Sequence, residues 1–302
     1  MTFLKQLSIF LILFASYLTF AQNDLPMSEG RINGEYSHFN SEKQTTTTTG
    51  SFKNNLRTGE WTVKDSADNI IYKRNYKSIY SYTETRSSDN EGVFLQKPFP
   101  LIRNNDNLYQ YPKFKNEDVL WTKRVWSILP KTDHGQLYSQ ELLIKINDWI
   151  NKNKIKFYQD DELSIVIDKQ DIDLINRNCA GVTIKKDYFF DKKSGMMMEQ
   201  IVALTFHLES TKNKEVEKFS VFYPTDGRKL LSSFNVSHKS EKIEHHDDLF
   251  FFQDYTEVIY NEANAKGIKI EPDFANIKQY QQTSNDIKQL IISTEHRLWL
   301  TD

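Results

Sequence analysis

The sequence predicts an α+β protein with antiparallel β-hairpins at its N-terminus, followed by a domain of several helices around an antiparallel β-meander. Two observations favour this fold class. Strand-like segments follow one another through short polar turns, without the helices that alternate with strands in parallel sheets. Segments with the apolar spacing of helices lie before and after that strand-rich block. We therefore expect helices and an antiparallel sheet in one domain.

Residues 1–21 are predicted to be a secretory signal peptide. Lys5 supplies a positive charge, Leu7–Leu18 is almost wholly apolar, and Thr19–Ala21 has the small-x-small pattern of a cleavage site. The apolar run is too short for a membrane span, and no later stretch reaches the roughly 18 apolar residues that a span needs. No cysteine follows the cleavage site, which excludes an N-terminal lipid anchor. We expect an exported protein without a membrane span.

A Gly-Glu-aromatic element recurs in residues 22–76, which predicts a hairpin region. It occurs as Gly34-Glu35-Tyr36 and again, 25 residues later, as Gly59-Glu60-Trp61. Glycine suits the tight turns of antiparallel strands, and an aromatic ring beside it can pack over the hairpin. The pattern resembles a degenerate MORN-type repeat, as in bacterial YwqK-like proteins. Plain β-hairpins explain it equally well.

Residues 77–112 are rich in Ser, Asn and Asp and carry three prolines, so we interpret them as an extended linker before a domain at 113–302. A helix is expected from about Asn116 until Pro130 ends it. A second helix is expected after Ser139, because its apolar residues recur with helical spacing up to Ile150.

Strands are predicted at 163–167 and, as a meander, at 182–191, 196–208 and 216–223. Polar turns separate the strands of the meander. The C-terminal part is predicted to be helical again. One helix would start at Asp247 or Asp248 and run to about Ala265, and a last one would run from Ser284 to Trp299.

Composition excludes several function classes. The chain has 302 residues, a formal net charge of −2, ten glycines and one cysteine. A near-neutral charge argues against a nucleic-acid binder that neutralises many phosphates. A single cysteine excludes a disulfide framework and a cysteine-only zinc site, and we expect Cys179 to be a buried structural thiol. We find no phosphate-binding, dinucleotide-binding or hydrolase motif, and predict no cofactor.

The best candidate for metal chemistry is His245-His246-Asp247-Asp248. Adjacent histidines point to different sides of a helix or strand, so a solvated helix start with acidic caps is the favoured interpretation. Asp160-Asp161-Glu162 lacks the alternating oxygen ligands of a calcium loop and is interpreted as a solvated turn. We interpret Met196–Met198 as strand packing rather than a copper site, and Phe250–Phe252 as core or interface.

An ordered set of motifs resembles the GldN/PorN family. Glu117 to Trp126 is similar to the family's D-V-x-W-x-K-R-x-W motif, and Asp187 to Asp191 to its D-W-x-F-D turn, which Met198 to Val202 follows. Tyr223-Pro224, with Arg228 close behind, is similar to the family's Y-P-x-x-R element. The likeness continues at the C-terminal end and spans about residues 93–302. The motif positions, which the resemblance marks as structural or interface residues, are Asp118, Trp121, Arg124, Trp126, Asp187, Phe189, Phe190, Asp191, Tyr223, Pro224, Arg228 and Trp299.

The resemblance implies a non-enzymatic structural subunit in the periplasm. Members of the family are parts of the type IX secretion and gliding motility machinery, where they associate with a GldK/PorK-like outer-membrane lipoprotein in rings. GldM/PorM-like proteins are further expected partners, and no nucleic acid is expected. Exposed aromatics among Trp121, Trp126, Phe250 and Phe251 would be interface anchors, although core packing is favoured for each. Two alternatives stay open: an exported binding module that uses the hairpins, and a metal-dependent exported enzyme.

The sequence also departs from the family pattern. A shortened stretch, Ile128–Gly135, replaces a longer polar one, Gln200 stands where the family tends to have arginine, and the hairpin region is additional. These differences are compatible with a divergent paralogue outside the core machine.

Overall fold

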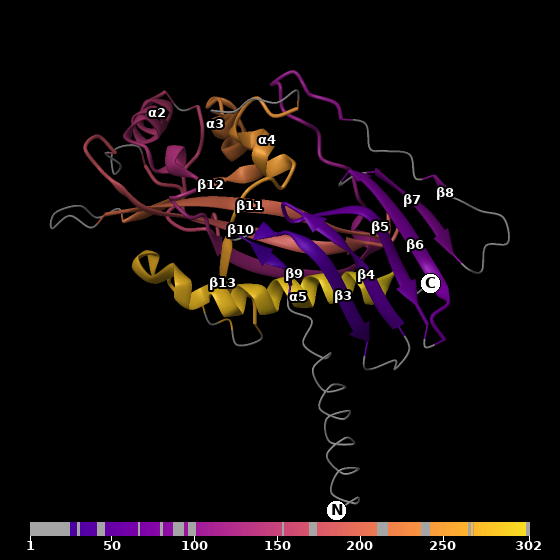
Figure 1. The fold of residues 1–302 in the computed structure, drawn as a ribbon. Coiled ribbons are helices and arrows are strands. Elements are labelled where there is room, and N and C mark those ends of the chain that lie inside the picture. Colours follow the sequence, from indigo (N-terminus) through magenta and orange to yellow (C-terminus); the bar gives the residue numbers. More distant parts are fainter. Residues whose placement is uncertain are drawn as a thin grey trace, which may run out of the picture. The chain divides into compact units, whose positions relative to one another are not determined.

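The computed structural model describes residues 25–28, 31–40, 46–65, 67–78, 81–86, 94–95, 101–152, 154–168, 174–209, 217–236, 242–264, 267 and 269–299. The predicted signal peptide lies outside these residues. The chain divides into two compact units, Met1–Phe99 and Pro100–Asp302. Both are built on antiparallel sheets, and the second also carries helices (Figure 1). The predicted α+β class is confirmed.

The first unit is a six-stranded antiparallel sheet in which each strand pairs with the next along the chain. A two-stranded sheet, β1 (Met27–Ser28) with β2 (Arg31–Ile32), precedes it. The six strands are β3 (Gly34–Asn40), β4 (Thr46–Lys53), β5 (Leu56–Lys64), β6 (Ile70–Ser78), β7 (Ser81–Arg86) and β8 (Phe94–Leu95). The predicted hairpins are therefore present, and the sheet continues past residue 77. The MORN-type assignment stays a prediction.

Trp61 is the centre of the aromatic packing in this unit. Its side chain is fully buried, and its ring centroid lies 4.9 Å from that of Phe52 and 5.7 Å from that of Tyr36. A Cβ atom on Gly50 would lie 2.1 Å from the Trp61 ring, so the indole needs a glycine beneath it. Aromatic pairs of this kind stabilise cross-strand packing.

The second unit is built on a five-stranded antiparallel sheet in the order β12-β11-β10-β9-β13. The strands are β9 (Val119–Ile128), β10 (Cys179–Asp191), β11 (Met196–Leu208), β12 (Lys218–Phe222) and β13 (Val258–Glu262). The predicted meander corresponds to β10, β11 and β12, and it is confirmed. Met196 and Met198 are buried in strand packing, as expected.

Short helical turns and α-helices surround this sheet. They are η1 (Asn116–Asp118), η2 (Gly135–Tyr138), α2 (Gln140–Asn151), the π-turn η3 (Tyr223–Gly227), α3 (Arg228–Ser232), α4 (His246–Phe251), η4 (Phe274–Tyr280) and α5 (Gln281–Leu298). In Figure 1, α2, α3 and α4 gather above β11 and β12, whereas α5 runs below β9 and β13. None of the helices in the described part of the chain is long and apolar enough to cross a membrane.

The main apolar cluster lies between β10, β11, β12 and the group of α2, α3 and α4. A second cluster joins Val125 and Ile259 of the sheet to Ile287 and Ile291 of α5. A third joins Trp126, Ile128 and Tyr260 to η4. Because Val125 and Trp126 alternate in β9, the last two clusters lie on opposite faces of that strand. Both faces of β9 are thus covered from Val125 to Ile128.

Three predicted elements are wrong. The segment expected as a helix from Asn116 is the strand β9, which follows one short turn. The helix expected to run to Ala265 ends at Phe251, and β13 follows it. Residues 163–167 form no strand, although Val166 makes a single bridge with Tyr158. In each case a short apolar run fits both helix and strand patterns.

Two helix starts were also predicted, with different outcomes. Ser139 caps α2 as expected, and its side chain accepts a hydrogen bond from the Leu142 amide. Ser284, by contrast, lies inside α5, which begins at Gln281. Its hydroxyl accepts the Ile259 amide at 3.0 Å and so ties α5 to the edge of β13.

Candidate functional site

An apolar pocket lies beside the part of β11 that β12 does not pair with. β12 pairs with β11 from Ala203 to His207, and β11 continues beyond this ladder as far as Met196. The pocket, of about 330 Å³, lies along that continuation. Its lining residues are Tyr111, Pro112, Lys113, Phe114, Phe189, Met198, Glu199, Gln200, Ile201, Tyr223 and Pro224.

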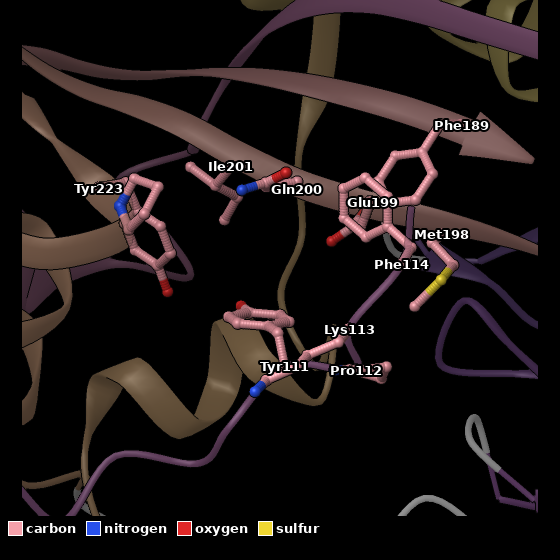
Figure 2. Close-up of a pocket in the computed structure, with 11 residues that line it drawn as sticks. Tyr111, Pro112, Lys113, Phe114, Phe189, Met198, Glu199, Gln200, Ile201 and Tyr223 are labelled. Atoms are coloured by element: carbon pink, nitrogen blue, oxygen red, sulfur yellow. The ribbon is translucent and has the colours of Figure 1, made fainter. Parts of the chain in front are cut away.

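Three separate parts of the chain form its walls. Four consecutive residues of β11, from Met198 to Ile201, line one side, so side chains from both faces of the strand reach the pocket. The segment 111–114 lies across from them, and Tyr223 closes one end (Figure 2). At the other end Phe114 packs on Phe189 with ring centroids 4.2 Å apart. The pocket therefore wraps around the edge of the strand.

A buried ion pair holds the Tyr223 end in place. Tyr223 donates its hydroxyl to Asp247 at 2.9 Å, and Arg228 binds the same carboxylate through two nitrogens at 3.1 and 2.7 Å. Arg228 also lies 4.8 Å from the centre of the Tyr111 ring. Burial raises the pKa of Tyr223 well above its ordinary value, so this hydroxyl keeps its proton and acts as a donor.

A buried charge network lies behind the β11 wall. Lys186 binds Glu199 at 2.9 Å and Glu257 at 2.6 Å, and Tyr255 donates to Glu199. Burial lowers the pKa of Lys186, but the two carboxylates outweigh it and leave the pKa well above its ordinary value. Burial also lowers the pKa of Lys288, which donates to the Glu257 backbone carbonyl at 3.3 Å. Glu199 is thus tied inward rather than free to meet a ligand.

The pocket brings together Phe189, Tyr223 and Pro224 of the predicted motif positions, with Arg228 directly behind. Sequence reasoning missed the remaining lining residues as a site. Met198–Ile201 lie in one of the family-like motifs, which is the signal that could have found them. Nothing in the sequence indicates that they share one pocket.

The other motif positions lie elsewhere in the second unit. Arg124 and Asp187 form a two-pronged pair across β9 and β10, with both contacts at 2.7 Å. The Asp118 carbonyl accepts the Lys192 amide, and Asp191 accepts the Ser194 amide. The aromatic members of this set pack in the interior or at its margin: Trp121, Trp126, Phe190 and Trp299.

Three predictions about individual residues can now be corrected or confirmed. Phe250 and Phe251 are buried, so their rings are core residues rather than exposed anchors. Asp161 is buried rather than solvated, because it accepts the Trp126 indole N–H and contacts Lys269. Cys179 is a buried thiol as expected, and burial raises its pKa to about 12.

The His245-His246 segment is also buried, so the predicted solvated helix start is wrong. His245, not an aspartate, is the cap residue of α4, and Asp248 completes a capping box with it. His245 contacts Arg103 at 3.2 Å, and His246 contacts the Phe234 carbonyl at 3.3 Å. Among the described residues, no group of three or more His, Cys, Asp or Glu could hold a metal ion.

The fold and site define an α+β protein with an apolar, aromatic-walled pocket at a strand edge. The family model described as "Gliding motility associated protein GldN" matches residues 168–300. This region runs from before β10 to just beyond the end of α5, and it is similar to that family. The resemblance inferred from the motifs is thereby confirmed, while β9 lies outside the matched range. The comparison with curated proteins found no match.

Proposed function

We propose that this chain is a non-enzymatic structural subunit of the type IX secretion and gliding motility machinery, located in the periplasm. The observation that carries the proposal is the GldN family match over residues 168–300. The residues of the candidate metal site in the sequence also support it. His245 and Asp247 are buried and bound to protein groups, so they stabilise the fold.

The proposal places the chain in a ring with a GldK/PorK-like outer-membrane lipoprotein, with GldM/PorM-like proteins as further partners. A closed ring needs two different complementary patches on each subunit. The pocket beside β11 supplies one surface of the composition found at interface cores, where aromatic residues and methionine are enriched. Its Phe114 side chain is 37% exposed and therefore accessible.

Deletion of the gene tests the assembly function. We expect loss of gliding and impaired secretion of proteins that carry the matching sorting domain, both restored by the wild-type gene. Normal secretion and gliding in a strain that has no paralogue would refute the proposal.

Localisation needs its own test, because it depends on the predicted signal peptide. Fractionation should recover the protein with the periplasmic and outer-membrane material, and mass spectrometry of its N-terminus should find Gln22 as the first residue. Recovery from the cytoplasm with residues 1–21 intact would contradict the proposed location.

A binding role of the first unit is the second candidate. Met1–Phe99 is a compact unit with the aromatic cluster of Trp61, which supports the idea that it works as a binding module. Expression of residues 22–92 tests it. A folded fragment that binds a peptide, glycan or lipid surface would favour this role.

A further inference from the structure

The segment 269–280, the clasp, crosses one face of the second sheet. At one end Glu271 pairs with Lys218 of β12 at 3.0 Å. At the other end the centre of the Tyr280 ring lies 5.9 Å from that of Tyr260 in β13. Because β12 and β13 are the two outer strands of the sheet, the clasp reaches from one edge to the other.

A single aromatic ring fixes the middle of the clasp to the sheet. Gly181 and His207 stand opposite each other in the ladder between β10 and β11, and Phe274 packs against both. A Cβ atom on Gly181 would lie 2.1 Å from the Phe274 ring, and the centre of the His207 ring lies 4.9 Å from that of Phe274. His207 is therefore partly covered by a residue of the clasp.

The clasp covers a polar face, so little apolar burial holds it in place. Thr183, Lys185 and Thr205 lie on the same face as His207, whereas residues of the main apolar cluster alternate with them on the other face. None of the residues of the clasp, all of which the structure describes, is buried. Segments with few buried apolar contacts are the ones that open locally while the rest of the fold stays intact.

The charged groups around His207 carry both signs and form ion pairs with one another. The pairs are Lys218 with Glu271, Lys269 with Asp161, and Lys185 with Glu162. Burial is the main cause that lowers the pKa of His207 from 6.5 to about 4. In the first two pairs the lysine lowers this pKa and the carboxylate raises it, so the effects of the charges oppose each other.

We propose that the clasp is a local, acid-sensitive device, which lies on the sheet while His207 is neutral and opens when His207 takes up a proton. A charged imidazole needs water around it, and the Phe274 ring excludes water from one side of His207. Opening uncovers the polar face and leaves the main apolar cluster intact. The inference is independent of the proposed assembly function, because it rests only on contacts within the second unit.

Hydrogen exchange by mass spectrometry, on the full chain without its predicted signal peptide, tests the proposal. If opening restores the ordinary pKa of His207, the open population should rise about thirtyfold between about pH 7.5 and about pH 5. After correction for the intrinsic effect of pH on exchange, we expect residues 274–280 to lose at least about tenfold in protection, with α2 unchanged. An unchanged clasp, or an equal loss in α2, would overturn the proposal.

Two histidine variants identify the group that takes up the proton. His207→Gln removes it and keeps a side chain that can bond with Thr183, so the pH dependence of exchange at 274–280 should disappear. His246→Gln is the matched control, because burial also lowers the pKa of His246, which contacts the Phe234 carbonyl rather than the clasp. Circular dichroism checks that both variants fold. Retained pH dependence in His207→Gln, or its loss in His246→Gln, would assign the response to another group and refute the proposal.

A further measurement does not need a histidine variant. Phe274→Leu removes the covering ring, so the midpoint of the His207 NMR titration should rise from near 4 by at least about one pH unit. Glu271→Gln breaks an exposed ion pair and should raise clasp opening only about twofold, with the response to pH retained. An unchanged His207 midpoint in Phe274→Leu, or a lost pH response in Glu271→Gln, would show that the clasp is not controlled by His207 beneath Phe274.

Discussion

At the residue scale, substitution of a few buried charged side chains should have a large effect on the free energy of unfolding. Asp247 forms an ion pair with Arg228 and accepts a hydrogen bond from the Tyr223 hydroxyl, and its side chain is fully buried. Replacing Asp247 with asparagine would leave the Arg228 guanidinium buried without its counter-charge, a loss that typically costs 3–5 kcal/mol. We expect Asp247→Asn to lower the free energy of unfolding of the second unit by about that amount, measured by urea denaturation.

The matched control is the other two-pronged pair. Arg124 and Asp187 have the same geometry, but their side chains are 41% and 30% exposed. Water can replace the lost contact there, so Asp187→Asn should cost about 1 kcal/mol or less. Equal losses in the two variants would show that burial does not set the strength of these pairs.

His207 should make the stability of the folded chain depend on pH. Burial, together with nearby Lys218, lowers its pKa from 6.5 to about 4. The unfolded chain therefore binds the proton more readily than the folded chain between those two values. Stability should fall as the pH drops from about 6.5 to about 4, with up to one proton taken up on unfolding. Histidine NMR resonances should place the His207 midpoint near 4.

A control separates His207 from the other histidines. Burial also lowers the pKa of His246, so His207→Gln should reduce the pH slope of stability without abolishing it. A midpoint near 6.5, or an unchanged slope in the variant, would contradict the assignment.

At the scale of secondary-structure elements, close backbone approach explains how η4 packs on the sheet. A Cβ atom on Gly181 would lie 2.1 Å from the Phe274 ring. Gly181→Ala should therefore push η4 off β10, destabilise the second unit by about 1–3 kcal/mol and speed amide exchange at residues 274–280. Gly135→Ala meets nothing within 4 Å and should be nearly neutral. Unchanged exchange in η4 would mean that the ring moves aside freely.

The elements that could be predicted from sequence have a clear apolar spacing or a clear polar turn beside them. α2 has a clear helical stripe and a cap at Ser139, and β10 and β11 are long strands separated by a polar turn. β9 was mistaken for a helix because its apolar residues fall in two groups, Val119–Trp121 and Val125–Trp126, which fit helical spacing as well as a strand. The prediction of one helix across Phe250 to Tyr260 was also wrong, since this segment divides between α4 and β13.

The pocket could be predicted only in fragments. Tyr223, Pro224 and Phe189 stand in motifs, but their meeting with the segment 111–114 depends on where β12 stops and η3 turns away. A periodicity in the sequence shows which face of a strand is buried, not where a neighbouring strand ends. The buried Lys186 network is equally non-local, since its partners come from β11 and from the chain between α4 and β13.

At the scale of the whole molecule, the two compact units predict separate responses to core damage. Trp61 is fully buried in the first unit, next to Phe52 and Tyr36. Trp61→Ala removes the largest ring of this cluster, and core changes of that size cost about 3–5 kcal/mol. We expect faster amide exchange throughout β4, β5 and β6, with α2 and β10 unchanged, because the main core of the second unit is built from its own residues.

Phe39→Ala is the control, since that ring is 48% exposed and its loss should cost less than about 1 kcal/mol. Hydrogen exchange by mass spectrometry reads both units in one experiment. If Trp61→Ala lowered protection equally in both units, the chain would unfold as a single cooperative block. The stability of the second unit would then depend on the integrity of the hairpin unit, which would give that additional region a stabilising role.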